Sequence, residues 1–260
     1  MRKYNMRQIW IIAKASILEN SRKQVFHVLC LLVLTVIVGS TLLSIFTEGV
    51  KLKILKDLCM TTILFGGTVL AIALGSTGIP NDIENRTIYP LIARPITRVH
   101  YVVGKFFGTF LTVAMGVAAM GLVFGCLIYS YQRSFDMFLP MALLFTLLET
   151  AIVAAVATAI STMATPAVTA MLTFMFYLFG TVKIGYFAGL IGRDSNPVTA
   201  TAAKLVYHLL PNLECFNLKT ALVHQDPVPA SYMIQVAVYG VCYIAFLLFL
   251  GSAYFARREV

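Results

Sequence analysis

The chain has 260 residues, of which 59% are hydrophobic and 12% charged, and its formal net charge is +9. A soluble globular domain carries about a quarter charged residues, so this composition predicts an integral membrane protein. It argues against a nucleic-acid-binding protein, because the basic residues are not gathered on a soluble domain. Segments of about 20 apolar residues, the length that crosses a bilayer, recur along the chain, so we expect an all-α fold with six transmembrane helices.

Residues 1–24 precede the first long apolar run and are expected to form an amphipathic helix in the membrane interface. Apolar side chains recur there at helical spacing: Met6, Ile9, Trp10, Ala13 and Ile17. Tryptophan suits the headgroup level, and a helix with one apolar face lies in the plane of the interface. The same pattern also fits a simple helical extension of the first span, and the sequence leaves both interpretations open.

The six expected spans cover residues 25–46, 58–79, 106–132, 137–163, 167–187 and 230–256. No small-residue cleavage site follows the first run, so it reads as a retained span and not as a signal peptide. The fourth and fifth spans are divided at Pro166, because proline disfavours helix at the preceding Thr165. A single broken or re-entrant segment is the alternative there.

The charge distribution predicts the orientation of these spans. With both termini on one face, that face holds more Lys and Arg than the other, and six basic residues precede the first span. The positive-inside rule therefore predicts cytoplasmic termini. Residues 80–105 then form a cytoplasmic loop, and residues 188–229 form an extracytoplasmic loop whose apolar stretches suggest short helices resting on the membrane surface.

Small residues recur at four-residue spacing within or near the spans, which lets helix backbones approach closely. These small residues are Gly104 with Gly108, Gly121 with Gly125, Gly185 with Gly189, and Ala151 with Ala155 and Ala159. We interpret them as helix packing and not as a specific dimerisation motif.

Several chemical motifs are absent from the sequence. There is no GxxxxGK[ST] phosphate-binding loop, no HExxH or CxxC metal motif, and no GxSxG nucleophile elbow. We therefore expect no catalytic, cofactor-binding or metal-binding residues in this chain, and no ATP hydrolysis by it alone.

Glu149 is the one acidic residue near the middle of an expected span. An ionised carboxylate at that depth is costly unless it is paired, hydrated or protonated. One interpretation is a residue that lines a translocation path or couples to a proton. The other is a structural role, either a hydrogen bond to a neighbouring helix, for example through Thr146 or Thr150, or a division of the spans that brings Glu149 nearer a surface.

The loop at 80–105 contains more helix-capping and helix-breaking residues than a simple connection needs. Asn81 suits a helix N-cap, and Glu84 lies three residues later, which is the spacing of a capping box. We therefore expect a short helix to begin after Pro80. Arg86, Arg94 and Arg98 are left to face water or a partner.

The stretch "ENRTIYPLIARPITRVHYVVGK", residues 84–105, resembles the segment between the second and third spans of ABC-2 type transporter permeases. The matching positions are Glu84, Thr87, Leu91, Pro95, Thr97, Arg98, Gly104 and Lys105. The resemblance continues in "IAKASILENSRKQVFHVL", in "LLPNLECFNL" and in the basic "FARREV" end. Arg86 departs from the pattern, because many members have glycine before the threonine.

This resemblance implies a permease subunit of an ATP-binding cassette exporter in a prokaryotic plasma membrane. The subunit would form the pathway as a homodimer or heterodimer and would be driven by separate ATPase subunits, which hold the ATP and magnesium. The loop would act as a coupling helix that docks on the ATPase, with contacts from Glu84, Arg86, Thr87, Arg94, Pro95 and Arg98.

Two other classes of function remain open in the sequence, a non-transporting membrane anchor or regulatory subunit and an intramembrane enzyme. The spans carry few charges, which favours a hydrophobic or amphipathic cargo. The direction of transport, export, is implied by the resemblance alone.

Overall fold

The structure of the chain is a computed structural model. It describes residues 2–40, 48–85, 97–134, 138–193, 211–224 and 228–257. These residues form helices in the order α1 (Arg2–Ser21), α2 (Gln24–Gly39), α3 (Glu48–Glu84), α5 (Arg98–Gln132), α6 (Phe138–Ser161), α7 (Pro166–Arg193), η2 (Glu214–Phe216), α9 (Lys219–His224) and α10 (Ala230–Arg257). The described part of the chain contains no strand, and an all-α integral membrane protein is confirmed.

Four of these helices are long and apolar enough to cross a membrane: Leu52–Glu84, Arg98–Gln132, Phe138–Ser161 and Ala230–Arg257. The bent pair of α1 and α2 makes a fifth if the two helices count as one span. The apolar part of α7, Pro166–Thr181, is shorter. The described residues therefore support four or five spans, and six remains a prediction.

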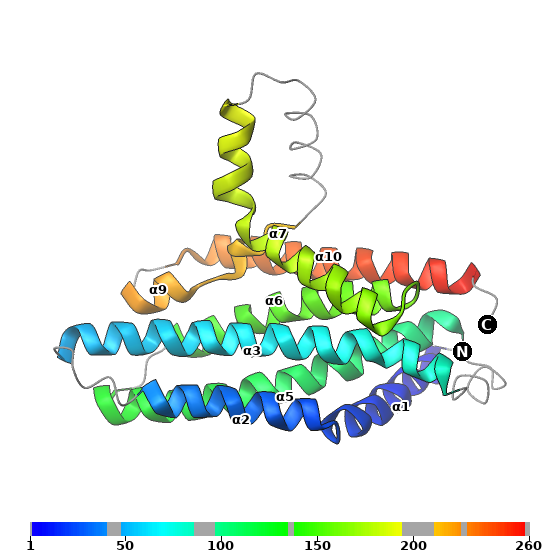
Figure 1. Ribbon diagram of the computed structural model, residues 1–260, viewed down its shortest axis with the longest axis horizontal. Helices are drawn as coiled ribbons and strands as arrows, with labels where there is room; N and C mark the ends of the chain where they lie inside the picture. The colour runs from blue at the N-terminus through cyan, green and yellow to red at the C-terminus, as the bar shows by residue number, and fades with distance from the viewer. Residues whose placement is uncertain are drawn as a thin grey trace.

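The first two helices meet at an angle. The axes of Gln8–Ser21 and Gln24–Gly39 differ by 64°, so α1 is not a straight extension of α2. Figure 1 shows α1 turning away from α2 along the start of α5, close to the point where α3 ends. Both termini lie at this end of the bundle, which we call the termini end.

The core is built around α6, which contacts α3, α5, α7 and α10. Side chains on every side of its middle turns are buried, as at Ile152, Val153 and Ala155. Neighbouring helices approach it through glycines, since a Cβ at Gly75 of α3 would lie 2.6 Å from the Cβ of Ala157. Small residues thus allow the close packing that apolar helices need in a membrane.

The second span is longer than the sequence predicts, and the expected helix start after Pro80 is wrong. Pro80 lies inside α3, which continues to Glu84, so Asn81 occupies the last turn of a helix and is not an N-cap. Tertiary packing explains the continuation. Ile79 is fully buried in a cluster with Ile12 of α1, and membrane helices tolerate proline where neighbouring helices and hydroxyl side chains compensate the lost hydrogen bond.

The chain leaves helix after Ser161 and α7 begins at Pro166, where the proline predicts a boundary. The fixed φ and missing N–H of proline suit the first position of a helix. The later turns of α7 project away from the bundle (Figure 1).

The helices η2 and α9 pack on the side of the bundle, with α9 on α3 and α6, and η2 on α6 and α7. Phe216 and Leu222 are buried, and Leu213 lies against Gly180 of α7, so these apolar side chains pack into the protein. The part of the expected extracytoplasmic loop at 194–210 lies outside the described part of the chain.

Candidate energy-coupling site

The last turn of α3 and the first turns of α5 flank residues 86–96, which the structure does not describe. Thr97 is the N-cap of α5: its backbone is extended, and its side chain accepts a hydrogen bond of 3.4 Å from the backbone N–H of His100. Its hydroxyl also contacts Nδ1 of His100. A hydroxyl at this position stabilises a helix start, so the threonine of the "PITR" element defines where the loop ends and α5 begins.

Charged side chains from three helices meet directly behind these helix ends. Lys105 Nζ of α5 lies 2.7 Å from Asp82 Oδ2 of α3 and 3.3 Å from Glu19 Oε2 of α1. The Tyr101 hydroxyl donates to the same Asp82 oxygen at 2.5 Å. Lys23 pairs with the other oxygen of Glu19 at 3.3 Å. We call Glu19, Lys23, Asp82, Tyr101 and Lys105 the ionic cluster.

The centre of the ionic cluster is buried. The side chains of Lys105 and Asp82 are 7% and 14% exposed, whereas that of Glu19 is 40% exposed. Desolvating two charges is costly, and a buried pair persists only where both partners and their hydrogen bonds are present. The pair therefore fixes the distance between the end of α3 and the start of α5.

The C-terminal end of α10 joins the same region. Arg98 donates from Nη1 to the Phe255 carbonyl oxygen at 3.1 Å, and its guanidinium lies 6.0 Å from the centre of the Phe255 ring. The Tyr101 ring stacks on Phe255 with a centroid distance of 5.8 Å. A cation at the end of a helix interacts favourably with its last carbonyl groups. The start of α5 is thus held to α1, α3 and α10.

The structure describes two of the predicted loop contacts. Glu84 is the exposed last residue of α3, and Arg98 is half-buried against α10 instead of facing water alone. Their docking role stays a prediction. The other predicted contacts, Arg86, Thr87, Arg94 and Pro95, lie outside the described residues.

The sequence analysis missed the pairing of Lys105 with both Asp82 and Glu19. The available signal was that an acidic residue, Asp82, follows one apolar span and a basic residue, Lys105, immediately precedes the next. Antiparallel neighbours bring such positions to the same depth, where opposite charges pair. The motif match singled out Lys105 only as part of the Gly104-Lys105 element.

Glu149 lies in the interior of the protein, 1% exposed. The hydroxyls of Thr146 and Thr150 donate to backbone carbonyls of their own helix, at 2.9 and 3.0 Å, so they do not supply the expected hydrogen bond to Glu149. Among the described residues, no group hydrogen-bonds to its Oε2 atom. A place on a translocation path remains a prediction.

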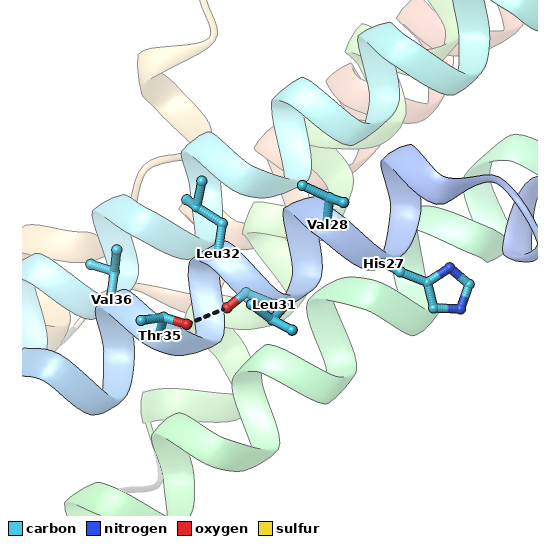
Figure 2. A pocket seen from close by; sticks show the side chains of 6 residues that line it. All are labelled: His27, Val28, Leu31, Leu32, Thr35 and Val36. Atoms are coloured by element: carbon cyan, nitrogen blue, oxygen red, sulfur yellow. Dashed lines mark hydrogen bonds between the residues drawn. The ribbon is translucent and has the colours of Figure 1, made fainter.

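Two apolar hollows lie on the helical surface. One of about 480 Å³ follows α2, and Figure 2 shows its lining residues His27, Val28, Leu31, Leu32, Thr35 and Val36 along that single helix. The other, of about 780 Å³, lies between α5 and α6. Its lining is apolar apart from the hydroxyls of Tyr129 and Ser130. Both hollows suit hydrocarbon chains and offer few polar groups to a charged ligand.

Comparison with known protein families identifies the family of the chain. The family model described as ABC-2 family transporter protein matches residues 4–260, so the chain belongs to that family. It is a multi-pass membrane permease of an ABC transporter, the transmembrane subunit and not the ATPase. Membership implies partnership with an ABC ATPase subunit. A search of curated proteins gives no significant match.

Proposed function

We propose that the chain is the permease subunit of an ABC exporter and that it forms the translocation pathway as a homodimer or heterodimer. Separate ATPase subunits, which bind ATP and magnesium, drive it by docking on residues 80–105. The permease itself has no cofactor in this proposal. The observation that carries it is the ionic cluster. There, Lys105 Nζ lies 2.7 Å from Asp82 Oδ2, and this ion pair connects the two helices that flank the loop.

The cluster supports a simple mechanism. A force on residues 86–96 would act on the last turn of α3 and the first two turns of α5 together, because a buried ion pair joins Asp82 to Lys105. Arg98 extends the connection to α10 through the Phe255 carbonyl. Closure of two ATPase subunits would then displace these helix ends as a unit, a rigid-body change of the kind that switches transporters between two states.

The composition of the spans favours a hydrophobic or amphipathic substrate. Both hollows are apolar. Glu149 is the candidate polar contact on the path, since its Oε2 atom has no hydrogen-bond partner within the described residues. Such an atom would gain a partner from a donor group on a substrate.

The basic residues support cytoplasmic termini in a prokaryotic plasma membrane. The first helix and the short link after it carry Lys14, Arg22 and Lys23, and α10 ends at Arg257. Positive charge is enriched on the cytoplasmic side of membrane helices. In this orientation the termini end faces the ATPase.

Charge reversal at the loop tests the function. The variants Glu84→Lys and Arg98→Glu are reconstituted in vesicles with the ATPase subunit that copurifies with the unaltered chain. We expect less ATPase subunit in the purified complex and slower ATP hydrolysis, with membrane insertion retained. Lys53→Glu, an exposed position at the far end of α3, is the matched control. Unaltered recovery and hydrolysis in both loop variants would contradict the proposal.

A further inference from the structure

Helix α1 lies directly on α5 behind the coupling loop. A Cβ built at Gly104 would lie 2.8 Å from the Ile12 side chain, and one at Gly108 would overlap the Ser16 side chain. No L side chain fits such a distance without a shift of backbone. The two helices are therefore packed as closely as helix backbones allow in a membrane.

The inward face of α1 matches this close approach. Ile12, Ala13, Ser16 and Asn20 are each at most 5% exposed. Asn20 Nδ2 donates to Ser16 Oγ at 3.4 Å, so the polar atoms on this face have partners within the helix. The contact is shaped by small and apolar side chains, and it carries no charge of its own.

Charge enters this contact through an ion pair between Lys105 of α5 and Glu19 of α1. The Lys105 ammonium group lies between a carboxylate of α1 and a carboxylate of α3, at 3.3 and 2.7 Å. Lys23, next to the α1–α2 bend, extends the chain of contacts: it pairs with Glu19 at 3.3 Å and donates to Thr77 Oγ1 of α3 at 3.2 Å. The bend and the loop are thus linked through Glu19 and Lys105.

We propose that Lys105 is a positioning residue that makes α1 move with the coupling loop. Its pair with Asp82 holds the end of α3, and its pair with Glu19 holds α1, so a displacement of the loop also displaces α1 and the bend into α2. The inference rests on the proposed function, because it assumes that an ATPase acts on the loop. It adds α1 to the moving part of the protein.

The test measures the position of α1 in the complete complex in lipid nanodiscs. Spin labels are placed at Leu18 of α1 and Met171 of α7, which are 52% and 64% exposed, in a background whose five cysteines are replaced by alanine. Distances are recorded without nucleotide and after trapping with ATP and vanadate. The unaltered sequence at Lys105 is expected to show a nucleotide-dependent change in the distance between the labels.

Lys105→Met keeps the aliphatic stem but removes the charge, and we expect it to abolish the distance change. Lys105→Arg should restore it. Glu19→Gln is the second variant. It removes the carboxylate of α1 from its pairs with Lys105 and Lys23 but leaves the buried pair of Lys105 with Asp82 intact, and it should also abolish the change. Lys219→Met is the matched control, because it removes the pair with Asp57, of 3.1 Å, at the opposite end of the bundle.

A full distance change in Lys105→Met or Glu19→Gln would overturn the inference. So would an unchanged distance in the unaltered protein while its bound ATPase subunits hydrolyse ATP. A chain that binds no ATPase subunit at all would instead overturn the proposed function, so the two failures are distinguishable.

Discussion

The strongest quantitative prediction concerns the cost of removing one partner from the buried pair. Asp82→Asn leaves Lys105 buried with only Glu19, which is 3.3 Å away and 40% exposed. Breaking a buried ion pair by removing one partner costs about 3–5 kcal/mol, and we take the lower value, about 3 kcal/mol, because Glu19 remains. At about 2–4 °C per kcal/mol for a protein of this size, the unfolding midpoint should fall by about 6–12 °C.

The assay is thermal unfolding of the purified protein in one detergent, followed by loss of the monodisperse fraction. Asp57→Asn is the control, because its pair with Lys219 has the same chemistry but its side chain is 53% exposed. An exposed pair is worth about 0–1 kcal/mol, so this variant should shift the midpoint little. Adding Lys105→Met to Asp82→Asn should recover part of the loss, since no unpaired buried charge then remains.

The result that refutes this reasoning is an equal shift for Asp82→Asn and Asp57→Asn. It would mean that the region around Lys105 is hydrated to the same extent as the bundle surface. A double variant less stable than either single variant would also contradict it. In that case the attraction between the two charges would exceed the free-energy cost of desolvating them.

Two further predictions use the same thermal assay. Gly108→Ala should lower the midpoint, because overpacking against Ser16 costs about 1–3 kcal/mol. Gly78→Ala has no neighbour within 4 Å of the added atom and should raise the midpoint, because alanine stabilises a helix by about 0.5–1 kcal/mol relative to glycine. Shifts of the same sign at both sites would contradict the close packing of α1 on α5. Glu149→Gln should leave the midpoint unchanged or raise it, because the carboxylate oxygen Oε2 forms no hydrogen bond with the described residues. If Glu149 lies on the translocation path, this variant should also slow ATP-driven substrate movement. A large loss of stability would show that Glu149 is structural instead.

The helical membrane architecture follows from the sequence because it depends on local properties. Apolar length predicts the spans, and the fixed φ and missing N–H of Pro166 predict the boundary at which α7 begins. Pro80 carries the same local signal but lies inside α3. The difference is tertiary, since Ile79 is buried beside Ile12 and helps to hold the turns that follow the proline.

The candidate site was only partly predictable for a related reason. The loop could be located from Thr97 and Arg98, which belong to a contiguous motif. The pair of Asp82 with Lys105 spans two helices, and its contact with Glu19 brings in a third that is far away in the sequence. No local pattern encodes a contact of this kind. It appears once the packing of α1 on Gly104 and Gly108 is known.

The central claim is that an ATPase subunit docks on the loop at the termini end. The most direct measurement places a photo-cross-linking amino acid at Glu84, next to the loop, or at Lys53, an exposed position at the other end of the same helix. We predict that the ATPase subunit is cross-linked from position 84 and not from position 53. Cross-linking from position 53, or none from position 84 in a complex that hydrolyses ATP, would contradict the account.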